Sequence, residues 1–320
     1  MTVTEATPRI GRAQLTRWLQ DYGVYAAVIV IVLVNIAFTA NFLSIGNLRT
    51  QLVQAAPVAI VALGMAMVIG TEGVDLSVGS VMALSAALIP LYLGYGALPA
   101  IIVALLAGLL AGTFSGFLVA RVGIQPIVAT LALLVGGRGL ALVIAGGQLR
   151  DVRDRSFLAL GSADLFGIPI SVLVAAVLAV IVGLVVSRTT FGRRLVAIGG
   201  NRPAAQLAGL PVTKVLIGVY AISGLLAAVA GVLYTSRLGA GDPANAGLLM
   251  ELSAITAVVV GGTPLSGGRV RILGTLAGAL LMQLVAATLI KNNLPNSTAQ
   301  MVQAAIIVAA VWAARERGRR

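Results

Sequence analysis

Cysteine and histidine are both absent from the 320-residue chain, and charged residues make up only 10% of it. Without thiols and imidazoles the chain can form neither disulfides nor a Cys/His metal site, and it has no thiol nucleophile and no imidazole base. A soluble domain of this length carries about 25% charged residues. The scarcity of charge therefore excludes a soluble fold, because too few polar residues remain to cover a surface in water.

Long apolar runs take the place of the missing polar residues. The chain is 59% hydrophobic, and apolar stretches long enough to span a bilayer recur along it. The strict alternation of a β-barrel is absent. The pattern predicts an all-α, polytopic membrane protein with about ten transmembrane helices. The expected spans are 22–40, 51–70, 79–96, 98–120, 125–145, 169–187, 214–236, 251–263, 272–290 and 300–314. Two of them, 251–263 and 300–314, are short, so they are extended by neighbours, tilted or partly re-entrant.

The basic residues indicate the orientation of the chain. A net charge of +12 could suggest nucleic-acid binding, but the basic residues lie in short segments between apolar runs, as membrane topology requires. With the N-terminus inside, 15 of the 22 Lys and Arg residues fall on the cytoplasmic side. The group Arg150, Arg153 and Arg155 opposes this bias. We expect both termini to be cytoplasmic.

The same topology divides the chain into three parts. We expect a cytoplasmic tail over 1–20, a transmembrane domain over 21–314 and a basic cytoplasmic tail over 315–320. A cleaved signal peptide would have a shorter apolar core, so the first helix is expected to be retained. The longest cytoplasmic loop is 188–213.

Two acids stand between the second and third expected spans. Glu72 and Asp75 lie in a glycine-flanked segment with almost no polar linker. Asp75 and Ser77 could cap the following helix. Glu72 has no such structural explanation, and an acid at this position faces either a pathway or the solvated membrane rim. Both interpretations of Glu72 stay open.

The cytoplasmic loop carries a predicted short helix over 201–210. Asn201 is a suitable N-cap, and Gly209 ends the helix. The small-residue face of this helix would suit docking into a groove on a partner, or the helix could simply lie on the membrane. The candidate docking residues are Gly199, Asn201, Ala204, Ala205 and Gly209.

A third polar segment precedes the span 251–263. It is rich in glycine and contains Asp242 and Asn245, which could contact a partner or a polar solute. Glu251 lies close enough to the membrane to need a partner. The candidate pathway or gate residues of the chain are therefore Glu72, Asp75, Ser77, Asn245 and Glu251. Turn formation alone would explain Asp242.

Two further patterns concern packing. Glycines recur at four-residue spacing from Gly108 to Gly116, which predicts close helix packing. The segment 66–80 resembles 257–269: in each, an apolar run is followed by glycines and then by Leu-Ser. This weak echo is compatible with a parallel internal repeat.

Five segments, taken in order, resemble the permeases of the ribose-type ABC sugar importers. They are 64–80, 125–131, 138–142, 197–210 and 251–269. The loop 242–252 looks closest to the galactofuranose importer permeases. One departure is that Thr71, Glu72 and Gly73 stand where the family commonly has Gly-Gly.

The resemblance implies a multi-pass inner-membrane subunit of a larger complex. That complex contains a second permease, identical or related, as well as cytoplasmic ABC ATPases and a periplasmic solute-binding protein. It also implies that the 188–213 loop touches the ATPase through a coupling helix. No cofactor is expected, since ATP would be bound by the partner.

Two other classes compete with an ATP-driven permease. An ion-coupled secondary transporter would need acids or bases inside its spans, and we expect only Arg138 there. A membrane-embedded enzyme would have almost no catalytic groups. The chain has two lysines, and neither lies in a phosphate-binding Gly-x-x-x-x-Gly-Lys loop, so any ATP hydrolysis must come from another chain.

Overall fold

The computed structural model describes residues 12–39, 41–292, 295, 297–298, 301–302, 304–306 and 308. Within them, seven helices are long and apolar enough to cross a membrane, and two shorter apolar helices cover Tyr22–Phe38 and Met250–Val260. The expectation of a mostly helical, polytopic membrane protein is confirmed. The last expected span, 300–314, lies mainly outside the described residues.

The helices follow the expected spans closely. The larger ones are α1 (Arg12–Phe38), α2 (Ile45–Gly70), α3 (Val78–Tyr92), α4 (Ala97–Phe117), α5 (Pro126–Ala145), α7 (Ile170–Arg188), α10 (Val212–Leu238), α11 (Met250–Val260) and α12 (Ile272–Lys291). A 3-10 turn covers Leu93–Tyr95, and a π-helical turn extends α4 over Leu118–Val122.

Two helices begin earlier than their apolar runs. α2 starts six residues before the expected span because the Ser44 hydroxyl accepts a hydrogen bond from the Asn47 N–H and so caps the helix. α1 starts at Arg12, so the boundary expected at residues 20 and 21 falls inside a helix. Apolar windows locate the part of a helix that lies in lipid, and the helix itself continues beyond it.

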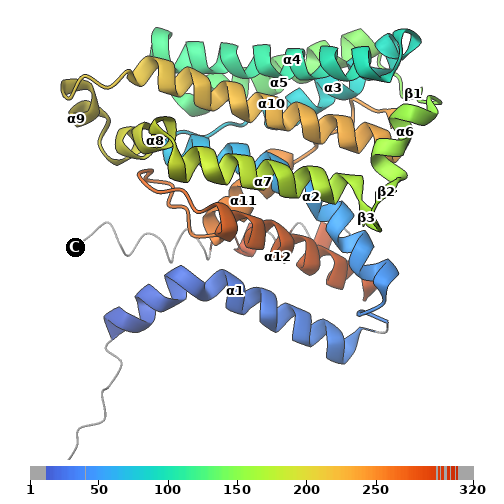
Figure 1. The fold of residues 1–320 in the computed structure, drawn as a ribbon, viewed down its shortest axis with the longest axis horizontal. Helices are drawn as coiled ribbons and strands as arrows, with labels where there is room; N and C mark the ends of the chain where they lie inside the picture. Colours follow the sequence, from blue (N-terminus) through green and yellow to red (C-terminus); the bar gives the residue numbers. More distant parts are fainter. Residues whose placement is uncertain are drawn as a thin grey trace, which may run out of the picture.

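Short elements cover the two ends of the bundle. At one end lie α8 (Thr190–Gly200) and α9 (Arg202–Leu207), and at the other lies α6 (Arg155–Ser162) (Figure 1). Two antiparallel pairs of two-residue strands, which the all-α expectation did not include, occur near α6. They are β1 (Arg150–Asp151) with β4 (Ala240–Gly241), and β2 (Asp164–Leu165) with β3 (Ile168–Pro169). We call the two ends the α9 end and the α6 end.

The centre of the bundle is built from α2 and α10. In the most apolar 18-residue window of α2, 78% of residues are buried, against 17% in α5. Both windows are strongly apolar, since helices at the periphery face lipid rather than water. Figure 1 shows α10 between α4 and α7, with α12 and then α1 farther out.

The glycine run in α4 confirms the predicted close packing. A Cβ placed on Gly108 would lie 2.6 Å from the Gly224 carbonyl oxygen of α10, and one on Gly112 would collide with the Tyr220 carbonyl oxygen. The absence of side chains on this face lets the two backbones touch, and dispersion contacts then hold the helices together in lipid.

Candidate functional site

Two segments of irregular backbone turn back into the bundle, one from each end. The first inner turn, residues 71–77, follows α2 and leads into α3. The second inner turn, residues 242–249, follows β4 and leads into α11. Lipid cannot satisfy irregular backbone, so such segments occur only where they are buried in protein or line a water-filled cavity.

The first inner turn returns to the level of the middle of α10. After α2 ends at Gly70, the chain folds back until Asp75 contacts Ser223, which lies near the midpoint of α10 and also packs on Gly64 of α2. α3 consequently begins inside the bundle and has only 15 residues. A helix of that length rises about 22 Å, less than the ~30 Å of a bilayer core.

Asp75 closes this turn with both carboxylate oxygens. Oδ1 accepts hydrogen bonds from the Ser77 backbone N–H at 3.0 Å and the Ser77 hydroxyl at 2.6 Å, and Oδ2 accepts one from the Ser223 hydroxyl at 2.8 Å. Asp75 and Ser77 are fully buried. The capping interpretation therefore needs adjustment. Ser77 occupies the N-cap position but makes no capping bond with its side chain, because its hydroxyl is turned toward Asp75.

The second inner turn meets the beginning of α3, just after the first inner turn, at a glycine contact. A Cβ on Gly79, in the first turn of α3, would collide with the Gly247 carbonyl oxygen, and one on Gly247 would lie 2.9 Å from the Gly79 Cα. Gly247 also has a φ of +67°, which glycine adopts without strain. The two short helices α3 and α11 thus begin beside each other.

Arg138 of α5 fastens the second inner turn to α3. Its guanidinium donates to the carbonyl oxygens of Pro243 at 3.2 Å, Ala244 at 3.0 Å and Ala246 at 3.2 Å, and more weakly to that of Gly79 at 3.5 Å. The carbonyls of Pro243, Ala244 and Ala246 belong to backbone outside regular helix, so they have no ladder to pair with. One side chain therefore binds three carbonyls of the turn and joins three parts of the chain.

Glu251 brings an unsatisfied polar group to this meeting point. Its side chain is 7% exposed, and Oε2 has no hydrogen-bond partner among the described residues. A Cβ on Gly79 would lie 2.5 Å from Oε2, so the carboxylate is aimed at the beginning of α3. The positive end of the α3 dipole favours a negative charge there.

The other two candidate pathway residues lie apart from this group. Asn245 is exposed on the second inner turn, and its amide donates to Asp242 at 2.8 Å. Glu72 is exposed at the α9 end with a φ of +65°. The structure thus places Asp75, Ser77 and Glu251 around the beginning of α3 and adds Arg138 and Ser223 to this group. Glu72 lies outside the group, at the surface.

The expectation that only a base lies within the spans is wrong. Asp75 and Glu251 are both buried, because the inner turns carry them below the ends of the apolar runs. Arg138, which the sequence showed as the base inside a span, was not among the candidate site residues. Its position inside an apolar run was the signal that could have placed it there. Ser223 gave no comparable signal.

The predicted loop helix forms as α9. The Asn201 side chain accepts from the Ala204 N–H at 2.9 Å, and Gly209 follows the helix with a φ of +73°. Ala205 is buried against the chain itself, whereas Ala204 is exposed and Leu207 is 92% exposed. The face of α9 turned away from the bundle is therefore formed around Leu207.

Gly199 connects this region to the first inner turn. A Cβ on Gly199 would collide with the Gly70 carbonyl oxygen and would lie 2.7 Å from the Gly268 N–H nitrogen. Gly268 in turn donates its N–H to the Gly70 carbonyl oxygen at 3.0 Å. The end of α8, the end of α2 and the loop before α12 thus share one backbone contact, which we call the glycine junction (Gly70, Gly199, Gly268).

Comparison with known proteins identifies the kind of molecule. A family model described as branched-chain amino acid transport system / permease component matches residues 47–311. The chain is 36% identical to the ribose import permease protein of Haemophilus influenzae over 313 residues, covering 94% of each chain. It is 39% identical to the galactofuranose transporter permease protein of Escherichia coli over 257 residues, covering 80% of this chain and 75% of the relative.

A fructose import permease protein of Bifidobacterium longum is 36% identical over 280 residues, covering 82% of this chain and 79% of the relative. All three relatives are permeases of import or transport systems, and so are transport components rather than enzymes. The near-complete coverage agrees with the resemblance found in the five sequence segments. The chain belongs to this family of membrane-spanning permease components.

Proposed function

We propose that this chain is the permease subunit of an ATP-binding-cassette importer in the inner membrane, and that it translocates a small sugar delivered by a periplasmic binding protein. The observation that carries the proposal is the match over 94% of the chain to a ribose import permease. The meeting of two inner turns in the bundle supports it, because transporters commonly form substrate sites where interrupted helices meet near the bilayer midplane. The proposed substrate is a sugar of the kind for which the relatives are named, such as ribose, galactofuranose or fructose.

Reconstitution tests this function directly. The permease is placed in liposomes with its ATPase, and uptake of labelled ribose, fructose and galactofuranose is measured with binding protein outside and ATP inside. We expect uptake of one sugar only when ATP is present. Uptake driven by a proton or sodium gradient without the ATPase would instead establish an ion-coupled transporter, which the buried Asp75 and Glu251 make worth testing.

In this proposal both termini are cytoplasmic, the α9 end faces the cytoplasm and a tenth span lies near 300–314. The distribution of basic residues supports this orientation, since Arg188, Arg193, Arg194, Arg202 and Lys214 all belong to the α9 end. Reporter fusions after Arg320 and within 150–165 should report opposite sides. Reports from the same side would contradict the topology.

A parallel internal repeat is also part of the proposal. The ends of α2 and α11 use the same backbone pattern: the Gly73 N–H donates to the Val68 carbonyl, and the Thr263 N–H donates to the Val258 carbonyl. One residue earlier, Glu72 and Gly262 both have positive φ. Two helix ends with one geometry, in segments that also resemble each other in sequence, support duplication.

The pathway is proposed to pass the meeting point of the inner turns. Asp75, Ser77 and Glu251 provide polar groups there, Asn245 lies on the exposed side of the second turn, and Glu72 lies at the cytoplasmic mouth. Two permease copies, identical or related, are proposed to form the complete pathway. No cofactor is proposed for the chain itself, since ATP would be bound by the ATPase.

The proposed contact with the ATPase is α9. The exposed Leu207 offers an apolar anchor for a groove on the partner, Asn201, Ala204 and Gly209 shape the helix, and Ala205 seats it on the chain. Movement of α9 would reach the first inner turn through Gly199 at the glycine junction.

Single cysteines test this contact, because the chain has none of its own. Leu207→Cys should crosslink to a cysteine in the ATPase groove, and Ala205→Cys, on the buried side of the same helix, is the matched control. Equal crosslinking of the two variants, or none from Leu207→Cys in an active complex, would reject α9 as the coupling element.

A further inference from the structure

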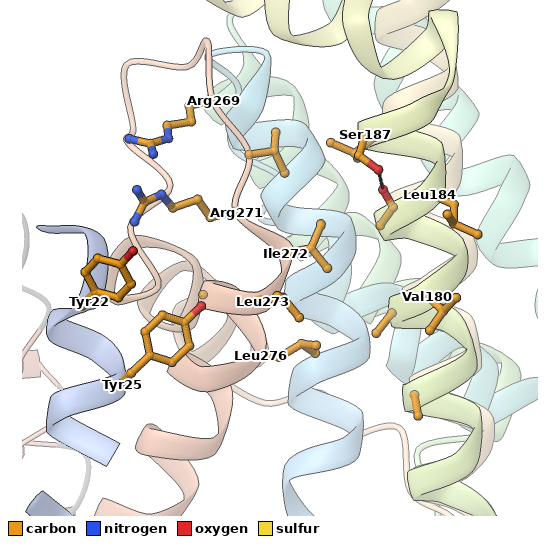
Figure 2. Close-up of a pocket in the computed structure, with 16 residues that line it drawn as sticks. Tyr22, Tyr25, Val180, Leu184, Ser187, Arg269, Arg271, Ile272, Leu273 and Leu276 are labelled. Atoms are coloured by element: carbon orange, nitrogen blue, oxygen red, sulfur yellow. Dashed lines mark hydrogen bonds between the residues drawn. The ribbon is translucent and has the colours of Figure 1, made fainter. Parts of the chain in front are cut away.

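Two surfaces along α12 differ in polarity. A groove of about 920 Å³ lies between α1, α7 and the beginning of α12, and side chains such as Val180, Leu184 and Ile272 make its walls apolar (Figure 2). Those walls suit lipid rather than a polar solute. Gln283 lies about 16 Å farther along α12 than Ile272, at 1.5 Å per residue. There its side chain meets carboxamides of α2.

Four amide side chains form a continuous series of hydrogen bonds between α2 and α12. The Gln51 Nε2 donates to the Asn47 Oδ1 at 3.3 Å. The Gln283 Nε2 donates to the Gln51 Oε1 at 3.1 Å and to the Gln54 Oε1 at 2.6 Å. Positions 47, 51 and 54 are spaced at i, i+4 and i+7, so they share one face of α2. We call this group the amide ladder (Asn47, Gln51, Gln54, Gln283).

The amide ladder leads from the α6 end into the membrane. Asn47 lies in the first turn of α2, close to Arg49, which forms an ion pair with Asp164 of β2. From Asn47 to Gln54 the helix rises about 10 Å, which is about a third of the ~30 Å hydrocarbon core. Both α2 and α12 are long and apolar enough to cross a membrane. The ladder therefore carries polar groups from the α6 end into an otherwise apolar layer.

The inner end of the ladder has hydrogen-bonding capacity to spare. A side-chain amide has two N–H donors and one acceptor oxygen. Among the described residues, none donates to the Gln283 Oε1 and none accepts from the Gln54 Nε2. Both side chains are half-buried, so they are accessible from outside the chain. Lipid cannot satisfy an amide, so this face calls for a polar partner.

We propose that the inner end of the amide ladder is a subsite for the sugar on its way from the α6 end to the meeting point of the inner turns. The inference rests on the proposed function, which supplies the sugar and its side of entry. A hydroxyl both donates and accepts, so adjacent sugar hydroxyls can donate to the Gln283 Oε1 and accept from the Gln54 Nε2. The ladder is uncharged, and such neutral bonds are weak enough for the sugar to move on.

The neighbouring helix connects this subsite to the rest of the pathway. α11 begins at the meeting point of the inner turns and packs on both α2 and α12, the two helices that carry the ladder. A sugar leaving the ladder along α11 would therefore come to Glu251, which lies in the first turn of that helix.

Uptake by the reconstituted complex with ATPase and binding protein tests the subsite. The parent is measured first: no sugar uptake would reject the proposed function and the subsite together, whereas uptake makes the later outcomes specific to the ladder. Gln54→Leu should lower uptake about tenfold, the effect of losing one or two neutral hydrogen bonds. The bond between Gln51 and Gln283 survives in this variant, so we expect it to fold. The control Gln148→Leu removes an exposed glutamine at the α6 end and should transport like the parent.

Monodeoxy analogues of the transported sugar separate binding from packing. The analogue that lacks the contacted hydroxyl should be taken up at similar rates by the parent and by Gln54→Leu, because both then lack the same bond. The preference of the binding protein acts equally on both chains and cancels in the ratio of their rates. An equal reduction for the sugar and for every analogue would assign Gln54 to helix packing and overturn the subsite.

Single cysteines test whether the ladder faces water, because the chain has none of its own. In the assembled complex, Gln54→Cys should react with a membrane-impermeant thiosulfonate added at the α6 end, and the transported sugar should slow the reaction several-fold. The matched control is Leu52→Cys, 44% exposed but nearly opposite Gln54 on α2, which should stay unreactive in lipid. No reaction of Gln54→Cys would mean that lipid or a second permease copy covers the ladder, and a reaction unchanged by sugar would mean that water alone fills it. Either result would overturn the proposal.

Discussion

The first inner turn is closed by a carboxylate and the second by a guanidinium, and the difference follows from what each stretch of backbone leaves unpaired. The first turn leads directly into α3, whose opening N–H groups need acceptors, and Asp75 accepts from Ser77 and Ser223. The second turn presents carbonyls, and Arg138 donates to them. An unsatisfied backbone group costs several kcal/mol in lipid, so each turn needs a side chain of matching polarity.

The two turns also differ in how firmly they are enclosed. Asp75 and Ser77 are fully buried, whereas Ala244, Asn245 and Leu248 are exposed. Releasing the second turn needs the separation of one guanidinium from its acceptors and of Gly247 from the beginning of α3. The second turn is therefore the better candidate for a moving gate, and the first for a fixed support.

Among substitutions at the two inner turns, Arg138→Gln should have the largest effect on stability and on sugar uptake. The amide can replace at most one or two of the carbonyl contacts, and bonds to a charged donor contribute about 1.5–3 kcal/mol each. We expect roughly 3–4 kcal/mol less stability for the closed second turn, and at least a tenfold fall in sugar uptake by reconstituted liposomes. Arg138→Lys keeps the charge without the fork and should be intermediate.

The control for this experiment is Arg150→Gln, which removes an exposed arginine at the α6 end. It should transport like the parent. If Arg138→Gln and Arg150→Gln behave alike in uptake and in thermal melting, Arg138 is not a latch and the contrast between the two turns has no functional meaning.

Asp75→Ala should have the next largest effect, and it should be structural. It strands the donors of Ser77 and Ser223 in a fully buried position, at a cost of roughly 2–3 kcal/mol. Asp75→Asn keeps an acceptor for Ser77 and should lose about 1 kcal/mol, as should Ser223→Ala. Melting temperatures in detergent measure the series. An order in which Asp75→Asn is as damaging as Asp75→Ala would mean that the charge, not the hydrogen bonds, closes the first turn.

The sequence predicted the helices well because apolar windows and helix length both follow the thickness of the bilayer. Nine expected spans correspond to helices of the described chain, and Asn201 and Gly209 bound α9 as their cap chemistry predicts. The depth at which a helix begins within the bundle was harder to predict. The shortness of 251–263 indicated a span that does not cross alone, and α11 is indeed 11 residues long. The expected span 79–96 gave no such indication for α3, because the 3-10 turn that follows α3 lengthens the apolar run.

The contacts of the site could be predicted only in part. Asp75 and Ser77 are neighbours in sequence, so their bond was accessible to capping arguments. Ser223 is 148 residues from Asp75, and Arg138 is more than 100 residues from the carbonyls that it binds. Backbone carbonyls carry no residue-type signal at all. A single sequence cannot indicate which of them a guanidinium reaches.

Glu251→Gln should raise stability, whereas most substitutions lower it. Its Oε2 is buried without a partner, and burying an unpaired charge costs more than the ~1 kcal/mol that the α3 dipole returns, so replacing the carboxylate by an amide of the same shape removes a net cost. We expect about 1 kcal/mol higher stability together with a fall in uptake, which is the signature of a group kept for function. Thermal melting and uptake are measured on the same preparation. Higher stability at unchanged uptake would show that Glu251 is dispensable to the pathway.

Substitutions of Glu72 should have the smallest effects. They distinguish the contribution of its backbone conformation from that of its charge. It occupies a position with φ of +65° at the end of α2, where Gly262 stands at the corresponding end of α11. A non-glycine residue costs about 1 kcal/mol in this conformation, so Glu72→Gly should raise stability by about that amount, while Glu72→Gln should leave it unchanged. Both substitutions remove the charge from the proposed cytoplasmic mouth. If that charge acts in gating, both should change uptake by a similar few-fold factor despite their different melting temperatures. Parental uptake in both variants would make Glu72 a solvated rim charge, and the two helix ends would then differ in backbone strain alone.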